Sequence, residues 1–398
     1  MAALMSLNAL AIDAMLPALQ DIGSSLGVED PNRRQLVVGV YLLSSGFGSL
    51  VPGLFADHFG RRPVLLTALA VYIGSSIACA LAPSFPMLLA LRALQGFGTA
   101  GLMVLPAAII RDRFEGDRMA RLTSTIFIVF MVVPVLAPSV GQAVLLIKHE
   151  WHWIFVALAA YATVIAAWTV VRLPETLHPE YRQPIDPRTI VHNLPLTLST
   201  RSAVGYVFAG GLTFGSTFGY VNSAQQLIGE HFGAAEIFPL IFGASAMTLA
   251  LSSFVNSRIV ERFGARRVSH TALLSFVVVS MAQVYVALFH GHSLLLFVPL
   301  ISINLCLLGF LGANFSSIAM QPFADSAGAA SSIQSALRML LGAVMGITVG
   351  QFYDGSAKPL AFALLGCSLS ALCLVLFSER GKLFTRPRGP VSISASPH

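Results

Sequence analysis

One acidic residue of this chain lies deep inside an apolar stretch, where it could bind and release a proton. Seventeen of the 18 acidic residues fall in loops or at the ends of apolar runs, and all ten histidines lie in such places as well. Asp13 is the exception. A charge at the centre of a bilayer costs at least a few kcal/mol, so an ionisable residue there is expected to have a function. The alternative is a neutral, structural polar residue near a helix end.

Arg92 is the basic residue that could act with Asp13. At 1.5 Å per helical residue, Asp13 lies roughly 13 Å before the end of its run and Arg92 roughly 10 Å after the start of its own. The two charges therefore share a level if the helices run in opposite directions. A nearby arginine favours the ionised acid, whereas burial favours the neutral acid. We expect Asp13 to bind a proton and a substrate in competition, with Arg92 tuning the acid. The alternative for Arg92 is a packing or snorkelling residue.

Arg338 is the second basic residue inside an apolar run. It lies eleven residues into that run, or about 16 Å, which is also near the level of Asp13. It could be a second counter-ion, or a contact for anionic or zwitterionic substrates. A structural link to the backbone carbonyls of a neighbouring helix is an equally open interpretation.

The elements that position these residues are membrane helices. The chain is 56% hydrophobic and 11% charged, and its mean hydropathy is +0.77, whereas a soluble protein has roughly 25% charged residues. This composition excludes a cytosolic enzyme, a nucleic-acid binder and a disordered protein. A spanning helix needs about 20 apolar residues, so the long apolar runs predict helices and exclude barrel strands. Twelve spans are predicted, at residues 2–22, 34–56, 63–82, 86–110, 119–147, 152–172, 201–228, 235–259, 268–289, 294–321, 327–353 and 358–378.

The basic residues predict how these spans cross the membrane. With the N-terminus in the cytoplasm, 18 of the 24 Lys and Arg residues fall on the cytoplasmic side and four fall outside. The positive-inside rule therefore predicts cytoplasmic N- and C-termini and an even number of spans. We expect a multi-pass protein of the inner membrane. The net charge of +6 is then an orientation signal and needs no nucleic-acid partner. The predicted units are an N-terminal six-helix bundle (1–172), a cytoplasmic linker (173–200), a C-terminal six-helix bundle (201–378) and a basic tail (379–398).

Other classes of function lack support in the sequence. The first apolar run begins at Ala2 without a preceding basic segment, which predicts a span and no cleavable signal peptide. The four cysteines lie within predicted spans, so neither a disulfide framework nor a metal site is expected. We find no nucleotide-binding motif and no catalytic triad spacing. A membrane-embedded enzyme or receptor would need a catalytic cluster or a large soluble domain, so we expect no enzyme and no cofactor.

A loop motif occurs twice in the chain. Residues Gly53–Arg62 join the second and third spans, and Val260–Arg267 join the eighth and ninth. Both contain an acidic residue, a His or Arg, Phe-Gly and then arginines, at an offset of 204 residues. Such a duplication, with a site between two halves, is typical of transporters. The first copy resembles the loop motif of the major facilitator superfamily.

Further motifs narrow this resemblance. Arg92–Gly96 resembles the fourth-helix motif of the drug:proton antiporters in that superfamily, and Pro134–Gly141 resembles their fifth-helix motif. Three other segments are similar to the Bcr/CflA multidrug-resistance branch: Asp13–Pro17, Trp151–Phe155 and Leu173–Leu177. Gln142 departs from the pattern, since the fifth-helix motif usually has a second glycine there, and the N-terminal extension common in the family is missing. The resemblance implies the all-α major facilitator fold of two pseudo-symmetric bundles, and a role in proton coupling for Arg92.

The resemblance also implies gating roles. Asp57 lies at the inner end of the second span, where it could accept hydrogen bonds from a basic residue such as Arg113 and face the N-terminus of the eleventh span. These contacts would stabilise an outward-facing state. Gly60 permits the tight turn before Arg61. The alternative is that the loop only sets the orientation of the chain by the positive-inside rule. That alternative explains the arginines but neither Asp57 nor Gly60.

Pro134, Pro138 and Gly141 interrupt the fifth span. Proline removes a backbone hydrogen bond and kinks a helix, and glycine allows helices to approach closely. In the antiporters that the chain resembles, this helix is thought to seal the centre against leak. A static kink is the alternative.

A cavity for lipophilic compounds should be lined by aromatic and adaptable side chains with few fixed polar groups. Phe214, Phe218 and Asn222 fall on one face of the seventh span. Helix packing is the alternative for each aromatic residue. The predicted substrate contacts are Asp13, Tyr41, Met131, Phe214, Phe218, Asn222, Asn304, Asn314 and Arg338.

Together these features predict a monomeric transporter that uses alternating access to export lipophilic drugs in exchange for protons. Its partners would be the drug, protons and membrane lipids, and the proton gradient would supply the energy. A proton-coupled transporter of one metabolite, such as a sugar, amino acid or nucleoside, remains the alternative. Such a transporter would be expected to have more fixed polar groups in its cavity.

Overall fold

The computed structural model describes residues 1–114, 116–182 and 199–384, and within these ranges every regular element is a helix. The first half of the chain contains α1 (Ala2–Asp13), α2 (Leu19–Ser25), α3 (Leu36–Gly48), α4 (Pro52–Phe59), α5 (Arg61–Ala80), α6 (Phe85–Arg113), α7 (Gly116–Lys148) and α8 (His152–Arg172). The second half contains α10 (Arg201–Ala224), α11 (Phe238–Phe263), α12 (Ala265–Phe289), α13 (Leu294–Met320), α14 (Ala327–Gln351) and α15 (Lys358–Ser378).

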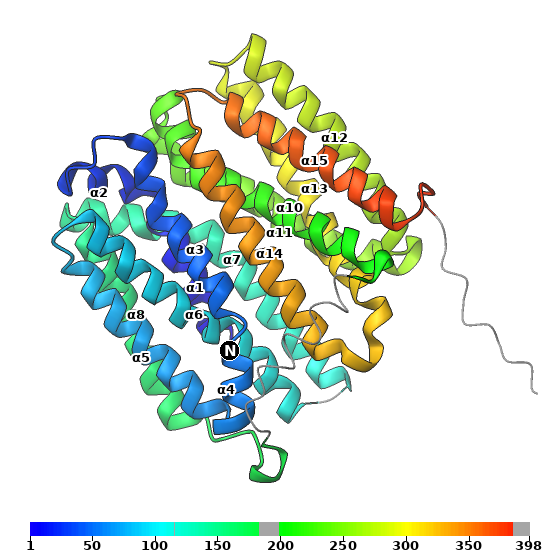
Figure 1. The fold of residues 1–398 in the computed structure, drawn as a ribbon. Coiled ribbons are helices and arrows are strands. Elements are labelled where there is room, and N and C mark those ends of the chain that lie inside the picture. Colours follow the sequence, from blue (N-terminus) through cyan, green and yellow to red (C-terminus); the bar gives the residue numbers. More distant parts are fainter. Residues whose placement is uncertain (115, 183–198, 385–398) are drawn as a thin grey trace, which may run out of the picture.

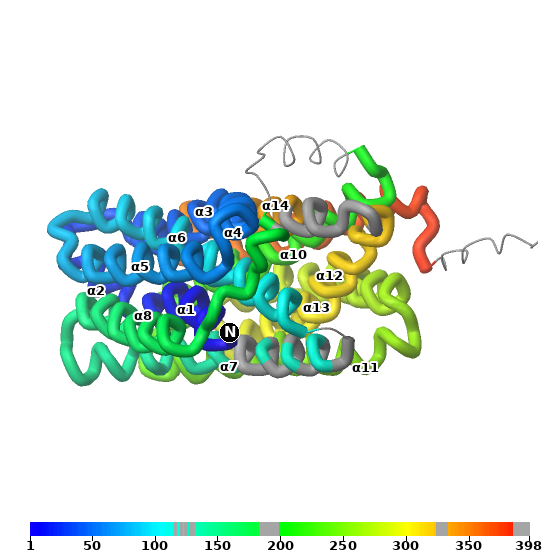
Figure 2. Tube along the Cα trace, turned by 90° about the horizontal axis from the view of Figure 1, so that it is seen from below, coloured from blue at the N-terminus to red at the C-terminus, as the bar shows by residue number. Residues whose placement is uncertain are grey.

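The helices form two bundles that lie side by side (Figure 1). The blue-to-teal helices of the first half make one bundle and the green-to-red helices of the second make the other. The bundles meet where α14 contacts α3 and where α11 contacts α7. Seen from below, the helices are arranged in layers across both bundles (Figure 2). The N-terminus and the end of α15 lie toward one end of the molecule, here named the termini end, and the opposite end is named the far end.

A helix or a helix pair occupies each of the twelve predicted spans. Within the described residues, nine helices are long and apolar enough to cross a membrane, or ten if α3 and α4, bent by 46°, count as one span. α10 is not among them, because its sequence is rich in Gly, Ser and Thr. Most of its residues are buried by other helices, and a helix surrounded by protein does not need an apolar surface.

The first span is broken at the acid. Pro17 has no N–H to donate to the carbonyl of Asp13, four residues earlier, and its ring crowds that carbonyl. α1 accordingly ends at Asp13, a 3₁₀ turn covers Leu16–Ala18, and α2 completes the span. Asp13 therefore sits at the C-terminus of a half-helix inside the bundle.

Two sets of glycines bring α10 and α14 together. Gly211, Gly215 and Gly219 of α10 face the large side chains Leu341, Met345 and Val349 of α14. In the reverse direction, Phe214 lies against Gly342, and Asn222 lies against Gly346. A Cβ at Gly342 would come within 2.6 Å of the Phe214 ring, so glycine is required for this approach. Small residues at four-residue spacing are the usual means of close helix packing in membranes.

Candidate functional site

Asp13 is buried at the break in the first span. Its residue is 6% exposed, and its carboxyl group has no hydrogen bond or ion pair with the residues that the structure describes. Gly141 of α7 lies directly against the carbonyl of Ala14, where no side chain would fit. The glycine of the fifth-helix motif therefore touches the chain one residue after the acid. Pro134 and Pro138 lie in the same helix, before Gly141 in the sequence.

Arg92 is fully buried in the first half, and each of its three guanidinium nitrogens donates a hydrogen bond. Its Nε donates to the carbonyl of Val37 at 3.0 Å, and its Nη2 donates to the carbonyl of Ala11 at 2.9 Å. Its Nη1 donates to Oε1 of Gln95 at 2.5 Å. Ala11 is two residues before Asp13, so the structure brings the two charged residues into one region without an ion pair between them.

Neighbouring polar groups extend the Arg92 network across four helices. The guanidinium carbon lies 4.3 Å from the ring centroid of Tyr41, and the Tyr41 hydroxyl donates to Oδ1 of Asn8 at 2.9 Å. Gln95 in turn donates to the Ser76 hydroxyl at 2.6 Å. The network thus ties α6 to α1, α3 and α5. Sequence reasoning missed Asn8, Ser76 and the carbonyl partners, because buried uncharged residues and backbone oxygens do not stand out in a membrane sequence.

Arg338 in the second half has very different surroundings. Its guanidinium carbon lies 5.0 Å from the ring centroid of Phe214. Its Nε is buried and has no hydrogen-bond partner, and no carboxylate among the described residues pairs with it. The rings of Phe214 and Phe218 lie 4.7 Å apart at a tilt of 58°. The predicted face of the seventh span therefore does meet Arg338.

The remaining predicted cavity residues lie elsewhere. Asn222 continues the face of Phe214 and Phe218, and both of its amide atoms are buried without a partner. Asn314 donates to Oδ1 of Asn256 at 2.8 Å, and Asn304 accepts a hydrogen bond from Ser280 at 3.4 Å. Like Tyr41, these two asparagines have protein partners. The side chain of Met131 lies outside the described residues.

The loop motif forms an ion-pair cluster at the termini end. The Arg61 guanidinium contacts Oδ1 of Asp57 at 2.5 Å and Oδ2 of Asp112 at 2.9 Å. In this structure Asp57 pairs with Arg61, which lies four residues later in the chain. The expected contact of Asp57 with Arg113 belongs to an outward-facing state and stays a prediction. The expected contact with the N-terminus of α14 involves side chains outside the described residues.

Gly60 and Glu175 shape the start of α5. Gly60 has φ +105°, and a Cβ there would come within 2.5 Å of Oε2 of Glu175. The Glu175 carboxylate accepts the backbone N–H groups of Arg61 at 2.9 Å and Arg62 at 3.1 Å, which caps the helix. Burial would raise the pKa of Glu175, but its backbone hydrogen bonds outweigh burial and hold that pKa below its usual value. Gly60 is thus needed both for the backbone turn and for this cap.

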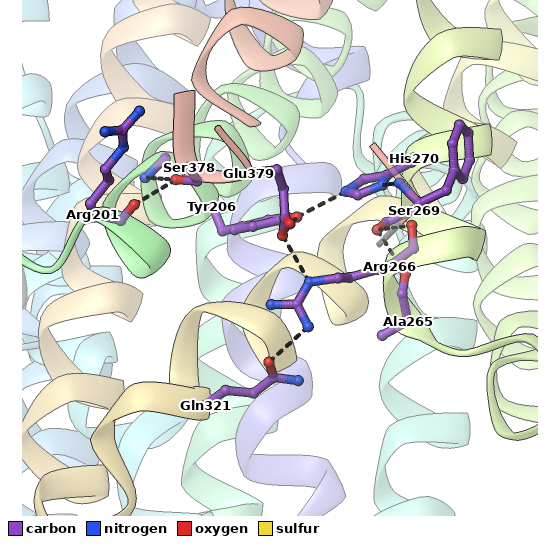
Figure 3. Close-up of polar contacts among 11 residues, drawn as sticks. Arg201, Tyr206, Ala265, Arg266, Ser269, His270, Gln321, Ser378 and Glu379 are labelled. Atoms are coloured by element: carbon purple, nitrogen blue, oxygen red, sulfur yellow. Dashed lines mark hydrogen bonds and ion pairs between the residues drawn. The ribbon is translucent and has the colours of Figure 1, made fainter. Parts of the chain in front are cut away.

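The second half has a counterpart of this cluster, shown in Figure 3. Glu379 follows α15 as Glu175 follows α8, at the same offset of 204 residues as the loop motif. It accepts hydrogen bonds from the Arg266 side chain at 2.8 Å and from the Tyr206 hydroxyl at 2.6 Å. Tyr206 also contacts Nε2 of His270 at 2.8 Å. The shared offset is a sequence signal that could have identified both glutamates.

The two halves are joined at the far end. Arg34 forms an ion pair with Glu230 at 3.2 Å, and Gln35 donates to the side-chain oxygen of Gln226. Gln226 also donates to the carbonyl of Pro31 at 3.0 Å. These contacts link the segment before α3 to the π-helical segment after α10, Gln225–His231.

A second set of far-end contacts involves the segment after α14. Asn32 donates to the carbonyl of Tyr353 at 2.7 Å, and Gln351 donates to the carbonyl of Asn32 at 2.8 Å. Burial, together with the charges of Glu230 and Asp354, raises the pKa of Tyr353 to about 12, so its hydroxyl stays protonated as a donor. Sequence reasoning did not predict these contacts, since each partner is an ordinary polar residue near the end of a helix.

The two ends of the molecule therefore differ. At the termini end, the ion pairs among the described residues stay within one half: Asp57–Arg61, Arg61–Asp112 and Arg266–Glu379. At the far end, an ion pair and several hydrogen bonds cross between the halves. The structure is thus held closed at the far end.

Comparisons with known proteins agree with this architecture. The Major Facilitator Superfamily model matches residues 1–347. A bicyclomycin resistance protein homolog of Haemophilus influenzae is 30% identical over 381 residues, which cover 94% of each chain. The multidrug resistance protein MdtL of Escherichia coli is 29% identical over 395 residues, which cover 96% of this chain and 95% of that one.

Solved structures match over the same length. The xylose transporter XylE from E. coli, in a partially occluded inward open conformation, has a TM-score of 0.72 at 13% identity, covering 95% of this chain and 97% of that one. A bacterial homolog of the human lysosomal transporter Spinster, in an inward-facing and occupied conformation, has a TM-score of 0.71 at 14% identity. It covers 96% of this chain and 95% of its own. At such identities the likeness concerns the fold alone.

Proposed function

The chain belongs to the Major Facilitator Superfamily of membrane transporters, and on this premise we propose that it exports lipophilic drugs across the inner membrane in exchange for protons. The curated relatives named above are drug-resistance proteins, which supports a drug as substrate. The observation that carries the proposal is Asp13, a buried acid at a break in the first span that has no partner among the described residues. The loop clusters and far-end contacts would supply the alternating access.

Asp13 is well placed to exchange a proton for a substrate. It lies in apolar surroundings at the C-terminus of α1, where the helix dipole and the lack of donors oppose a negative charge. Binding a proton, or a substrate that donates a hydrogen bond or carries a positive charge, removes that penalty. The two ligands would then compete for one carboxyl group, which is the requirement for antiport. Broken helices at the binding site recur in secondary transporters.

Arg92 is proposed to couple this site to the rest of the first bundle. It binds the carbonyl of Ala11 on α1 and the carbonyl of Val37 on α3. Movement of the half-helix on proton or drug binding would therefore be transmitted to α3, which contacts the second half. Gly141 of α7 would seal the same region from the other side.

We propose that the termini are cytoplasmic, as the distribution of Lys and Arg predicts. The far-end contacts then close the outer side, and the structure is inward-facing. In the outward-facing state the termini end would close instead, with Asp57, Gly60, Arg61 and Arg113 near the junction of the halves.

A transporter of one metabolite is less well supported. Asn314, which could have recognised sugar hydroxyls, is engaged with Asn256, and Oδ1 of Asn304 accepts from Ser280, although its Nδ2 has no partner among the described residues. The likeness to sugar transporters is a likeness of fold.

The decisive experiment measures drug susceptibility in an efflux-deficient host that expresses the chain, with and without a proton uncoupler. We expect resistance to at least one lipophilic drug, and we expect the uncoupler and Asp13→Asn each to abolish it. Asp21→Asn is the matched control, because Asp21 is an exposed acid on α2 of the same span. Membrane levels of each variant are compared by immunoblot. Full proton-driven resistance in the Asp13→Asn variant would overturn the assignment of Asp13, and no resistance to any compound would favour a metabolite transporter.

A further inference from the structure

The Arg338 side chain is a membrane-embedded cation that proton coupling through Asp13 does not use. It lies on α14, and the described residues offer it no carboxylate and no carbonyl as a hydrogen-bond partner. A buried charged group is normally paired and fully hydrogen-bonded, because an unpaired one costs several kcal/mol. A cation kept in such a place is expected to meet its partner in another state of the protein or in a ligand.

The side chains around Arg338 favour a ligand. Its guanidinium carbon lies 5.0 Å from the centroid of the Phe214 ring, and this ring pairs with Phe218 at 4.7 Å. Stacking fixes the plane of the guanidinium without using any N–H group. The donors therefore stay available for a planar anion, while the phenyl rings offer apolar and aromatic contacts next to it.

Asn222 supplies a second, independent observation. It is 1% exposed, and neither its Oδ1 nor its Nδ2 has a hydrogen-bond partner. It lies two turns beyond Phe214 on the same face of α10, and Gly346 makes room for it on α14. A buried amide with both ends unpaired is rare in a native protein and calls for a bound partner. The unsatisfied groups of this region thus lie along one seam between α10 and α14, with the two phenyl rings between them.

We infer that the seam between α10 and α14 recognises substrates that carry an aromatic ring and a carboxylate or similar planar anion. The anion would accept paired hydrogen bonds from Arg338, the aromatic body would contact Phe214 and Phe218, and Asn222 would bind a polar group at the distal end of the compound. This inference rests on the proposed function, since it names the class of substrate. Arg338 would be the specificity-determining residue, because a neutral compound of the same shape cannot pair with the guanidinium.

The test compares three ligands that share one aromatic body: 2-naphthoate, 2-naphthamide and 2-naphthylmethylammonium. Their binding to the purified full-length protein in lipid nanodiscs is measured by calorimetry. A charge-assisted hydrogen bond is worth about 1.5–3 kcal/mol, so we expect 2-naphthoate to bind at least about tenfold more tightly than 2-naphthamide. Arg338→Gln should remove this preference, and Arg338→Lys should keep part of it, because lysine retains the charge but not the planar fork.

Arg258→Gln is the matched control. Arg258 also stacks on a phenylalanine, at 5.4 Å from the Phe254 ring centroid, but it lies on the exposed surface of α11. We expect this variant to keep the full preference for 2-naphthoate. Phe214→Leu removes the ring but leaves the arginine, and it should weaken the binding of all three ligands without changing their order. If the Arg338→Gln variant does not fold, the Phe214→Leu variant still tests whether these ligands bind at the proposed site.

Two results would overturn the inference: equal binding of the three ligands to the unaltered protein, or an undiminished preference in the Arg338→Gln variant. Neither result depends on a proton gradient. Proton-driven resistance to lipophilic drugs, including aromatic carboxylates, is measured separately in cells, so a preference for 2-naphthoate without resistance to any of them would contradict the proposed efflux while supporting anion recognition. Conversely, drug resistance in cells without a binding preference for 2-naphthoate would reject the proposed anion site and leave the proposed efflux standing.

Discussion

Arg92 and Arg338 are arginines within the spans of opposite halves, and their surroundings differ: Arg92 is fully buried, whereas Arg338 is partly exposed and only its Nε is buried. Arg92 donates to two backbone carbonyls and to Gln95, and it stacks on Tyr41. Arg338 stacks on Phe214, but its Nε has no partner. The first guanidinium is saturated by its own protein and the second is not. A charged residue inside a membrane span is therefore expected to have a role. Its hydrogen bonds within the protein indicate whether that role is to stabilise the fold or to bind a ligand.

The two acids repeat this contrast. Glu175 accepts hydrogen bonds from the backbone of Arg61 and Arg62 and caps α5. Asp13 has no partner among the described residues. We expect the saturated members, Arg92 and Glu175, to contribute chiefly to stability, and the unsaturated members, Asp13 and Arg338, to contribute chiefly to transport. The predictions below test this division, from the largest expected change in stability to the smallest.

Arg92→Leu should cause the largest loss of stability. It removes three hydrogen bonds, each worth roughly 0.6 kcal/mol in a membrane protein, so we expect a loss of about 2 kcal/mol. The loss is measured by unfolding the purified protein in detergent. Arg111→Gln, an exposed arginine in the last turn of the same helix, should change little. If the Arg92→Leu variant were as stable as the unaltered protein, Arg92 would not be a stabilising residue, and the proposed separation of stabilising residues from transport residues would be wrong.

Glu175→Ala should have a smaller, pH-dependent effect. Loss of the cap should cost about 1 kcal/mol at neutral pH. Because the pKa of Glu175 is lowered in the folded protein, its contribution is present above its ordinary pKa of 4.5 and is lost as the pH falls below that value. The difference between the variant and the unaltered protein should therefore shrink on acidification. Glu180→Ala, an exposed acid nearby, should show no such trend, and a constant difference across this pH range would count against the cap.

Arg338→Met should cost no stability and can raise it, because it replaces a cation that has no hydrogen-bond partner among the described residues by an apolar side chain. Its unfolding is measured alongside that of Arg92→Leu under the same conditions. If the two variants lose similar stability, then Arg338 is a structural residue and the contrast between the arginines is wrong.

Sequence reasoning predicted the architecture well, because span length and charge placement have strong patterns. The helices in the twelve predicted spans and the two bundles follow from such patterns. The break of the first span at Pro17 was not predicted, because residues 2–22 were predicted to form one continuous span. The partners of the functional residues were harder to predict. Arg92 binds backbone carbonyls, which every residue carries, so no side-chain pattern marks them. Asp57 pairs with Arg61 and not with Arg113, a choice decided by local helix geometry.

The far-end contacts have a consequence for which compounds can be transported at all. A ligand can shift a conformational equilibrium only by the difference between its affinities for the two states. The contacts of Arg34, Gln35 and Asn32 with the second half stabilise one of those states. They therefore set an energetic threshold: a compound that binds both states equally well, however tightly, occupies the site without opening the far end. Such a compound would act as an inhibitor, and strengthening or weakening the contacts would move the boundary between inhibitors and substrates.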